Sequence, residues 1–440
     1  MIESIPSSQA QVVGALACQR DSYLRSIEAE VVSCLKFSPP KTKQANGQKK
    51  KQAATDSSSL HPRDSWLIEF SDSVLFPEGG GQPCDYGSVL SLSSSSTEPI
   101  PITRVERQGL QCVYHVGEAL TPGTKVRQDV DFSRRWDHMQ QHTGQHLLSA
   151  IMDTFENLKT LGWGMGTDGG MNYVDLPRKP SQSEMQAIQH RCNEIILENV
   201  TITVTTPNGA VTTKLPGDYD QDKGLVRVIR IGGLDHNTCC GTHLSQTSHI
   251  SLILLHFTQP VHSTNFRLYF SAGDRAIKIS TESINALRTI AKTTSSSSGP
   301  AEVVTSVKRV CDTAADLKRR ERSLLSEIAR FEGERVKAVL QSGKNAWVYR
   351  PSDTLDFLNM VVFEVKDAVG DGRIVVLISG EGQRGGPVVV IGQKESVSEA
   401  VRKIQELVPH IKGGGKGERW QGKAKEWMKG DLDAIKSVVE

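Results

Sequence analysis

His142-Thr-Gly-Gln-His146 and Cys239-Cys-Gly-Thr-His243 are the two stretches that decide how this chain is organised. Residues four apart lie on one face of a helix, so His142 and His146 can direct both imidazoles at a single point. Cys239 and His243 repeat this spacing. Three imidazoles and one thiolate form the nitrogen and sulfur set that suits zinc. We therefore expect one site with these four residues as ligands and one zinc ion per chain.

Chance is the simplest alternative for the histidine pair, because 12 histidines in 440 residues sometimes fall four apart. A second pair that contains Cys makes chance a poor explanation. The HExxH and HxxEH motifs of zinc proteases are both excluded, because Thr143 and Gln145 occupy the positions of the catalytic Glu. A hydrolase built on this site would need a different base.

Two neighbours of the ligand set could compete for the metal. His138 extends the histidine row by four residues, and we expect it at the surface because four ligands are already complete. Cys240 has a spacing to His243 that suits the shared face less well, so we expect it to be a small buried residue.

Composition sets the general class of protein. A chain of 440 residues has room for two to four domains, and its formal net charge of +2 means that any nucleic-acid surface must be a local patch. The 8 cysteines show no disulfide-framework spacing, which is typical of a reducing compartment. Because we find neither a signal sequence nor an apolar run of about 18 residues, we expect a cytoplasmic protein without a membrane contact.

Residues 1–130 predict a small β-barrel-like domain of short strands separated by turn residues. A Lys- and Ser-rich segment near 38–62 reads as a flexible insertion. The domain also contains Phe76-Pro-Glu-Gly-Gly-Gly-Gln82, in which Gly79, Gly80 and Gly81 let backbone amides approach a ligand closely. An ordinary glycine-rich hairpin loop is the alternative for this stretch.

Residues 131–275 predict the zinc-containing α+β domain. A helix capped by Ser133 or Asp131 carries the two histidines. The stretch 162–166, with Trp163, is a candidate pocket wall, and an alternating strand at 224–231 delivers the chain to Cys239. Asp235 is expected to orient a ligand histidine.

Residues 276–345 predict a helical connector. Apolar residues follow a heptad-like seam from Val303 to Phe331, interrupted at Glu321. An intramolecular hairpin, a dimer contact and one ordinary packed helix all fit this pattern. The oligomeric state is therefore left undetermined.

Residues 346–440 predict an α/β domain, with strands at 360–364, 373–379 and 388–392 and a helix at 396–408. It ends in a basic, glycine-rich tail. Positive charges and tryptophans alternate there in the way that RNA contacts use, which makes tRNA binding the hypothesis for Lys412, Lys416, Arg419, Trp420 and Lys423, with Trp427 as a further stacking side chain. A solvated basic tail is the alternative.

Three motifs resemble the hallmarks of the alanyl-tRNA synthetase editing module and its free-standing AlaX relatives: His142-Thr-Gly-Gln-His-Leu-Leu148, Cys239-Cys-Gly-Thr-His-Leu244 and the glycine stretch that ends at Gln82. Over nearly its whole length the chain resembles the long, eukaryotic-type alanyl-tRNA editing protein. It shows no likeness to the synthetase's adenylation module, so a complete aminoacylating enzyme is not expected. The resemblance implies a hydrolase that acts in trans on alanine tRNA mischarged with serine, with glycine left open.

The resemblance also assigns roles to residues. It implies zinc ligation by His142, His146, Cys239 and His243, and an aminoacyl pocket lined by Gly79, Gly80, Gly81 and Gln82. Arg267 resembles the family's basic residue near the end of this domain, and we expect it and Trp163 to contact the substrate. Ser73 stands where many relatives have Thr, and its hydroxyl could recognise a seryl group.

Four protein ligands close the coordination of zinc, so we expect the metal to organise the pocket and sense the amino group. Water would then be placed by the glycine amides and by Gln145 or Gln82. A non-catalytic, zinc-stabilised RNA-binding or chaperone-partner protein is the hypothesis from a different class, and the C-terminal Lys/Trp segment motivates it.

Overall fold

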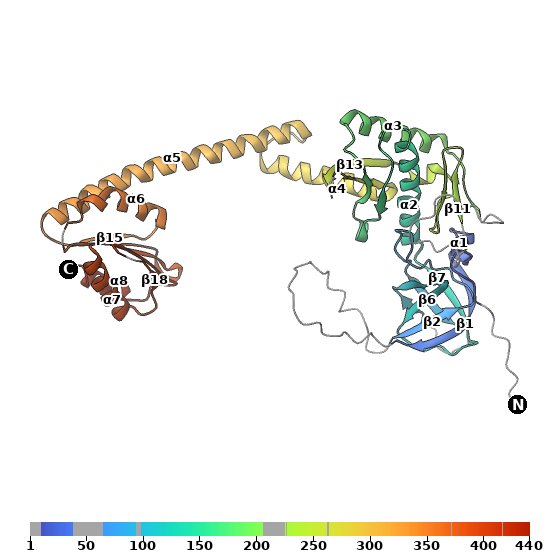
Figure 1. Cartoon of the computed structure of the whole chain (residues 1–440), viewed down its shortest axis with the longest axis horizontal. Coiled ribbons are helices and arrows are strands. Elements are labelled where there is room, and N and C mark those ends of the chain that lie inside the picture. Colours follow the sequence, from blue (N-terminus) through green and yellow to red (C-terminus); the bar gives the residue numbers. More distant parts are fainter. Residues whose placement is uncertain are drawn as a thin grey trace. The chain divides into compact units, whose positions relative to one another are not determined.

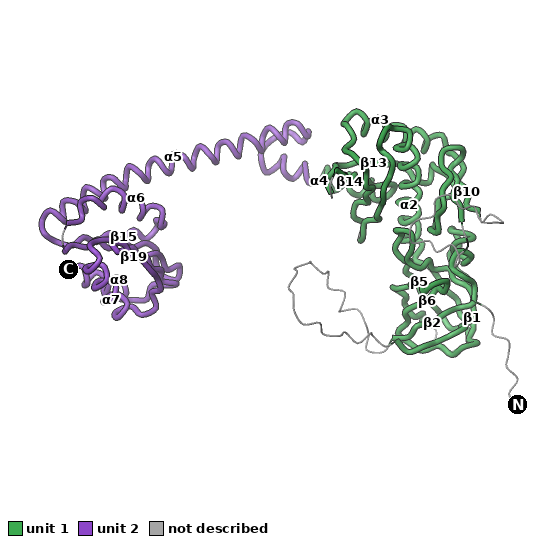
Figure 2. The backbone as a smooth tube through the Cα atoms, viewed as in Figure 1, with its two compact units in different colours: residues 1–285 green, residues 286–440 purple. Residues whose placement is uncertain are grey.

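The computed structural model describes residues 10–37, 65–93, 98–205, 225, 227–261, 264–370, 372–415 and 417–440. The insertion expected at 38–62 lies outside these residues. The chain forms two compact units, residues 1–285 and 286–440 (Figure 2). Both units mix helices with strands, which confirms the α+β class. Among the described residues, no helix is long and apolar enough to cross a membrane.

The first unit begins with a short helix, α1 (Ala17–Arg20), and a seven-stranded antiparallel sheet (Figure 1). Its strands are β1 (Ser26–Lys36), β2 (Trp66–Phe70), β3 (Gly87–Ser91), β4 (Ile100–Ile102), β5 (Val105–Gln108), β6 (Gln111–Val116) and β7 (Lys125–Val130). Their order is β4-β3-β7-β1-β2-β6-β5, and β4 also contacts β6, so the sheet curls into a near-barrel. Apolar side chains of alternate strand residues fill its interior.

One polar side chain inside the near-barrel fixes the segment that leads to the glycine stretch. Gln128 of β7 is fully buried, and its Oε1 accepts hydrogen bonds from Val74 N at 3.0 Å and from the Tyr114 hydroxyl at 2.9 Å. Its Nε2 donates to Asp72 O at 2.9 Å. Because a buried amide must be paired, this arrangement ties residues 72–74 to the strands.

The rest of the first unit packs around helix α2 (Phe132–Met152), which the Asp131 side chain caps by accepting from Arg134 N. A capping box at Ser181 begins α3 (Gln182–Glu198). Two antiparallel sheets accompany these helices, one with the order β10-β11-β12 and one with the order β13-β14-β9-β8. Their strands are β8 (Gly162–Gly164), β9 (Asn172–Leu176), β10 (Ile202–Thr205), β11 (Val228–Ile231), β12 (Asp235–Thr238), β13 (Ile253–Pro260) and β14 (Phe266–Ala272), and the short helices η1 (Thr167–Gly169) and η2 (Thr247–Ile250) lie between them.

Close packing of α2 explains why residue 144, within the histidine motif, is a glycine. A Cβ on Gly144 would lie 2.9 Å from the Ala272 Cβ, so only glycine lets α2 approach the end of β14 this closely. The buried face of α2 then joins the core of the sheets through Met139, Leu147 and Leu148. This packing sets the position of both motif histidines.

Two long helices follow, α4 (Gly273–Thr293) and α5 (Pro300–Gln341). Val303 is buried, whereas most of the apolar seam on α5, including Val310, Leu317, Leu324 and Phe331, is exposed. One ordinary packed helix therefore does not account for the seam. The hairpin and dimer interpretations stay predictions.

The second unit contains a five-stranded sheet with the order β15-β16-β17-β19-β18, in which only the β15/β16 pair is parallel. The strands are β15 (Ala346–Arg350), β16 (Ile374–Ser379), β17 (Gly386–Gly392), β18 (Lys412–Gly414) and β19 (Arg419–Ala424). One face packs against α5 and α6 (Leu355–Val365), and the other packs against α7 (Lys394–Leu407) and α8 (Asp431–Ser437). Short helices η3 (Lys366–Ala368) and η4 (Gly382–Arg384) lie in the connections. Central strand β16 is buried along its whole length.

Two sequence predictions for this unit are wrong. The strand expected at 360–364 is part of helix α6, whose buried residues Phe357, Leu358, Val361, Val362 and Val365 follow the spacing of a helix face. A short apolar run cannot be assigned to strand or helix by periodicity alone. The basic tail is in fact the strand pair β18/β19, which joins the sheet.

Candidate metal centre

His142 and His146 project from α2, and Cys239 and His243 come from the loop after β12. All four residues are buried, and their candidate ligand atoms lie within 4.8 Å of one another. Cys239 Sγ is 3.3 Å from His142 Nε2 and 3.2 Å from His243 Nε2. Tetrahedral zinc with ordinary bond lengths separates sulfur and nitrogen ligands by about 3.5 Å. The donor set and its spacing therefore fit a zinc ion.

The second ring nitrogen of each histidine has a partner that fixes the ring. Gln82 Oε1 lies 2.8 Å from His142 Nδ1, Asp235 Oδ2 lies 2.9 Å from His146 Nδ1, and Thr143 Oγ1 lies 3.4 Å from His243 Nδ1. When Nδ1 carries the proton and donates it to these oxygens, the Nε2 lone pair is free for a metal. Asp235 thus contacts a candidate ligand histidine, and its orienting role stays a prediction. Gln82 and Thr143 make the same kind of contact, which the sequence analysis did not assign to them.

The electrostatics of the cluster favour a cation. Burial alone would raise the pKa of the Cys239 thiol, but the charges of His142 and His243 and hydrogen bonds with His142 and His146 lower that pKa well below its usual value. Burial lowers the pKa of His243 to about 3, which leaves a neutral imidazole. Burial also opposes protonation of His146, but its hydrogen bonds with Asp235 and Cys239 outweigh burial and raise its pKa to about 10. The metal-free cluster therefore pairs the thiolate with an imidazolium, and His146 must lose this proton to bind a metal. Thiolate and neutral imidazole are the protonation states that bind zinc.

The loop from Cys239 to His243 is not a helix, so the helical reason given for its spacing is wrong. It is held instead by buried polar contacts. Arg227 Nη1 donates to the carbonyls of Cys240 at 2.8 Å and Gly241 at 2.9 Å, and Gln19 Nε2 donates to the same Cys240 carbonyl at 2.8 Å. A Cβ on Gly241 would meet His142 Cε1 at 2.3 Å, so glycine is needed where the loop crosses the ring.

Arg227 was missed by the sequence analysis, which assigned no role to the basic residues of this strand. The alternation of the strand could have predicted its burial, because Arg227 lies on the same strand face as Ile229 and Ile231, both of which are buried. Cys240 is buried, as expected. Burial raises the pKa of its thiol to about 11, which is consistent with a packing residue.

The prediction that His138 lies at the surface is wrong. Its side chain is 2% exposed, and its Nδ1 is buried without a hydrogen-bond partner among the described residues. Burial, followed by the charges of Arg134 and Arg275, lowers its pKa to about 3. The amphipathic pattern failed here because the middle of α2 is covered on all sides, with every residue from 138 to 148 buried.

The glycine stretch forms a tight turn. Gly79 N donates to Gln82 O and Gln82 N donates to Gly79 O, both at 3.1 Å, while Gly80 and Gly81 have φ values of +59° and +81°. Two central residues with positive φ define a two-residue hairpin turn that glycine favours. A Cβ on Gly80 would lie 3.1 Å from Cys240 Sγ, and one on Gly81 would lie 2.9 Å from Trp163 Cε2. The stretch 79–82 therefore has the shape of a glycine-rich hairpin turn.

Trp163 links this turn to the cluster, because its ring lies 4.7 Å from the His142 ring. The turn at 79–82 and Trp163 therefore adjoin the candidate ligands, and their role as pocket residues stays a prediction. In β8, Trp163 lies beside Val174 of β9, which in turn pairs with Leu268 of β14. All three side chains consequently share the face of the sheet that packs toward α2.

Gln82 and Gln145 differ in whether their side-chain amides have an atom available to hydrogen-bond a water molecule. Gln82 is fully buried, its Nε2 donates to Thr242 Oγ1 at 2.8 Å, and its Oε1 already accepts from Thr242 N at 3.1 Å and faces His142. These contacts occupy both ends of its amide, and placement of water by Gln82 stays a prediction. Gln145 lies about 60° around α2 from His142. Its Nε2 donates to Ser149 Oγ at 2.8 Å, and its Oε1 has no partner among the described residues.

Two other predicted site residues lie apart from the cluster. The Ser73 hydroxyl is 2% exposed and bonds to Leu75 O and to the Tyr114 hydroxyl inside the near-barrel. Arg267 pairs with Asp175, with Nε 2.8 Å from Oδ1, on the sheet face opposite Trp163. A direct contact of Arg267 with the aminoacyl group is therefore not supported, and recognition by Ser73 stays a prediction.

The residues predicted to bind tRNA lie in the second unit. Along β19, Arg419, Gln421 and Lys423 are exposed, whereas Trp420 is 6% exposed and belongs to the core, as Trp427 does at 8%. Strand alternation turned the tryptophans inward, so the prediction that they stack on RNA is wrong. Lys412 is exposed on β18, and Lys416 lies outside the described residues. Contacts of the three exposed cations with tRNA stay a prediction.

A buried cluster of three histidines and one cysteine, joined to a near-barrel through a glycine turn, defines an α+β protein with a candidate metal site. Residues 226–269, which include Cys239 and His243, match the family described as threonyl and alanyl tRNA synthetase second additional domain.

Relatives match the chain over nearly its full length. The chain is 33% identical to the putative alanyl-tRNA editing protein alaX of Saccharomyces cerevisiae, over 97% of this chain and 96% of the yeast protein. It is 32% identical to the alanyl-tRNA editing protein Aarsd1 of Danio rerio, over 94% and 95%, and 23% identical to the alanyl-tRNA editing protein AlaX-L of Pyrococcus horikoshii, over 90% and 91%. The chain belongs to the alanyl-tRNA editing protein family.

Proposed function

We propose that this protein is an aminoacyl-tRNA deacylase that hydrolyses the ester of alanine tRNA mischarged with serine, and that glycine is its second substrate. The observation that carries the proposal is the junction of the four candidate ligands, the glycine turn and Trp163 in one place. Family membership supports the same reaction, because the relatives are named alanyl-tRNA editing proteins. The cellular site of action that fits this substrate is the cytoplasm.

One zinc ion per chain would be held by His142, His146, Cys239 and His243. When bound, it would supply positive charge and Lewis acidity at the centre of these ligands. Gln82, Asp235 and Thr143 keep the ligand rings in place, so that the site is preorganised before substrate arrives.

The turn supplies donors for the reacting ester. Its reciprocal hydrogen bonds use the amides of Gly79 and Gln82 and leave the amides of Gly80 and Gly81 without a partner among the described residues. Free amides in a fixed turn stabilise the oxyanion that forms when water attacks an ester carbonyl. Gln145 Oε1 is the available acceptor that would orient this water or the substrate amino group.

The decisive test incubates the purified protein with seryl-, glycyl- and alanyl-tRNA for alanine and follows loss of each ester. We expect rapid loss of the seryl ester, loss of the glycyl ester as well, no acceleration for alanyl-tRNA, and no turnover by Cys239→Ala. Retention of tRNA without turnover by the unmodified protein would instead support the non-catalytic RNA-binding hypothesis.

A further inference from the structure

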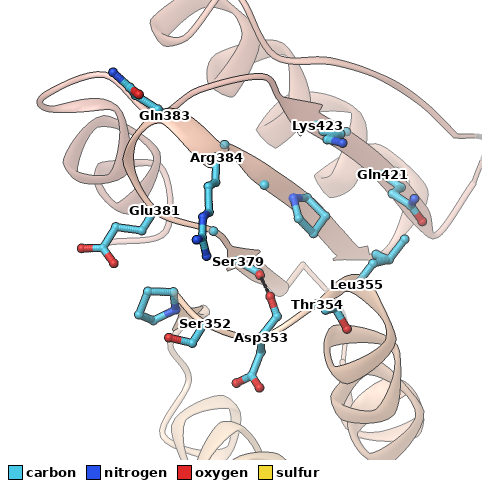
Figure 3. Close-up of a pocket in the computed structure, with 16 residues that line it drawn as sticks. Ser352, Asp353, Thr354, Leu355, Ser379, Glu381, Gln383, Arg384, Gln421 and Lys423 are labelled. Carbon is cyan, nitrogen blue, oxygen red and sulfur yellow. Dashed lines mark hydrogen bonds between the residues drawn. The ribbon is translucent and has the colours of Figure 1, made fainter. Parts of the chain in front are cut away.

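The second unit contains a cavity of about 900 Å³. It lies beyond the carboxyl ends of the parallel strands β15 and β16, between the segment 351–355 that follows β15 and the segment 379–387 that follows β16 (Figure 3). Residues 421–423 of β19 close another side. In open, mostly parallel α/β sheets, ligands bind in the crevice outside the carboxyl ends of the strands, and β15 and β16 are the one parallel pair in this otherwise antiparallel sheet.

The wall made by segment 379–387 consists largely of backbone. Gly380 has a φ of +93°, and a Cβ there would lie 1.6 Å from Gly385 O, because the loop folds back onto itself. Such a loop lets a ligand approach peptide groups closely. Opposite it, the Ser352 and Thr354 side chains have no hydrogen-bond partner among the described residues, and Thr354 precedes α6 without capping it.

Two positively charged side chains line the cavity. Among the described residues, neither the Arg384 guanidinium nor the Lys423 ammonium forms a hydrogen bond or an ion pair. Figure 3 shows the Arg384 guanidinium extending into the space between the two segments, with Lys423 on the β19 side. Isolated cations in a cavity favour an anionic ligand.

Asp353 and Glu381 also line the cavity, but in the part of the chain that the structure describes neither carboxylate pairs with Arg384 or Lys423. Asp353 is already paired with Arg350, with Nε 2.6 Å from Oδ2, and its carboxylate points away from Arg384 (Figure 3). The Glu381 carboxylate likewise points outward in this view. The charge that faces the cavity is therefore positive.

The size of the cavity and its apolar surface limit the class of ligand that it can bind. A volume of about 900 Å³ is far larger than a single phosphate and lies in the range of small-molecule and cofactor sites. Pro351, Leu355 and Pro387 add apolar surface on which a base can lie. We propose that this cavity binds the phosphate of a nucleotide, held by Arg384 and Lys423, with the backbone of the 380–386 loop as its wall. Either a free mononucleotide or one nucleotide of an RNA strand carries this chemistry.

The test titrates the full-length protein with three probes, each over the same series of salt concentrations: inorganic phosphate, AMP and an eight-nucleotide single-stranded RNA. Arg384→Ala and Lys423→Ala are compared with Arg402→Ala, a control that removes an exposed cation from α7, where Arg402 pairs with Glu406 at 2.9 Å. Circular dichroism and thermal unfolding establish that the variants fold. We expect each cavity variant to weaken binding about tenfold or more and the control to leave it unchanged.

The probes separate the two sources of the phosphate. Tighter binding of AMP than of the RNA assigns the site to a free nucleotide, whereas tighter RNA binding with a shallower salt dependence in each cavity variant assigns it to an RNA strand. Absence of binding of both AMP and the RNA at millimolar concentration overturns the proposal, and so does equal affinity in Arg384→Ala and the unmodified protein. The deacylation of seryl-tRNA by the first unit is measured separately, so neither result depends on the other.

Discussion

Two glycine-rich bends of this protein lie beside chemically active side chains, and they differ in how those side chains are paired. Beside the turn at 79–82, each histidine of the cluster is fixed by an oxygen of Gln82, Asp235 or Thr143. Beside the loop at 380–386, the two cations have no partner among the described residues. The first region is built around a centre inside the protein, whereas the second is built for a charge that arrives from outside. The predictions below test this difference.

The largest effect is expected where a ligand of the centre is removed. Cys239→Ser should lower the metal content from one ion per chain to near zero and reduce deacylation of seryl-tRNA by more than about 100-fold, because removal of one ligand dismantles a four-ligand site. Metal analysis of the purified variant and single-turnover deacylation measure both. Cys240→Ser is the matched control, since Cys240 is the adjacent buried cysteine and is not one of the candidate ligands. Equal metal loss in both variants would contradict this assignment.

A smaller loss is expected when the support of a ligand is removed. Gln82→Ala deletes the oxygen that faces His142 Nδ1 at 2.8 Å, and metal affinity should fall about 10- to 100-fold, as for other partners of ligand histidines. Competition with a chromophoric chelator measures this affinity. Gln111→Ala, which removes an exposed glutamine of β6, should leave it unchanged. An unaltered affinity in Gln82→Ala would mean that the glutamine belongs to the substrate pocket alone.

The sequence predicted the parts of this site that depend on residues close together in the sequence, and it did not predict the contacts between distant segments. The four candidate ligands follow from residue type and spacing, and the Asp131 cap and the α2 helix follow from local sequence signals. Gln82 and Arg227 act across 60 and 13 residues of sequence, and a pattern that describes only one segment cannot place their partners. For Cys239 to His243, the same spacing that suits a helix also suits a loop.

Burial was the second quantity that sequence reasoning predicted poorly. His138 and Trp420 carry polar or amphipathic side chains, which are found at surfaces as well as in interiors, so residue type alone did not decide their position. Strand alternation would have decided Trp420 had the tail been recognised as a strand. Glycine and lysine content instead suggested an irregular segment there, and pairing with β17, which is distant in sequence, overrode that local preference.

The two bends themselves can be compared by the same substitution. Gly81→Ala and Gly382→Ala both place a Cβ at positive φ, +81° and +51°, and each should cost about 1 kcal/mol of unfolding free energy. Only the Cβ at Gly81 meets another group, Trp163 Cε2 at 2.9 Å, whereas Gly382 has nothing within 4 Å. Gly81→Ala should therefore also slow deacylation about tenfold, because it displaces the pocket wall. Equal deacylation rates in the two variants would show that the turn does not shape the reacting site.

The smallest effect concerns His138, the buried side chain of α2 whose Nδ1 has no hydrogen-bond partner among the described residues. Its pKa falls from 6.5 to about 3 through burial and the nearby Arg134 and Arg275, so the folded protein keeps it neutral. The unfolded chain binds its proton first as the pH falls, and stability is therefore lost between about pH 6.5 and pH 3. His138→Leu removes this loss. Between pH 7.5 and 5.5, urea unfolding of the first unit should show the unmodified protein losing about 1 kcal/mol more than the variant.

His190→Leu is the matched control for this measurement, because it removes a histidine of α3 whose side chain is 75% exposed. It should leave the pH dependence as it is in the unmodified protein. A His138→Leu variant with the same pH dependence as this control would mean that His138 gains a proton or a partner in solution. His138 Nδ1 would then resemble the Arg384 and Lys423 side chains of the second unit, because it too would be free to bind a partner from outside the protein. The two regions would then differ less in how their polar groups are paired.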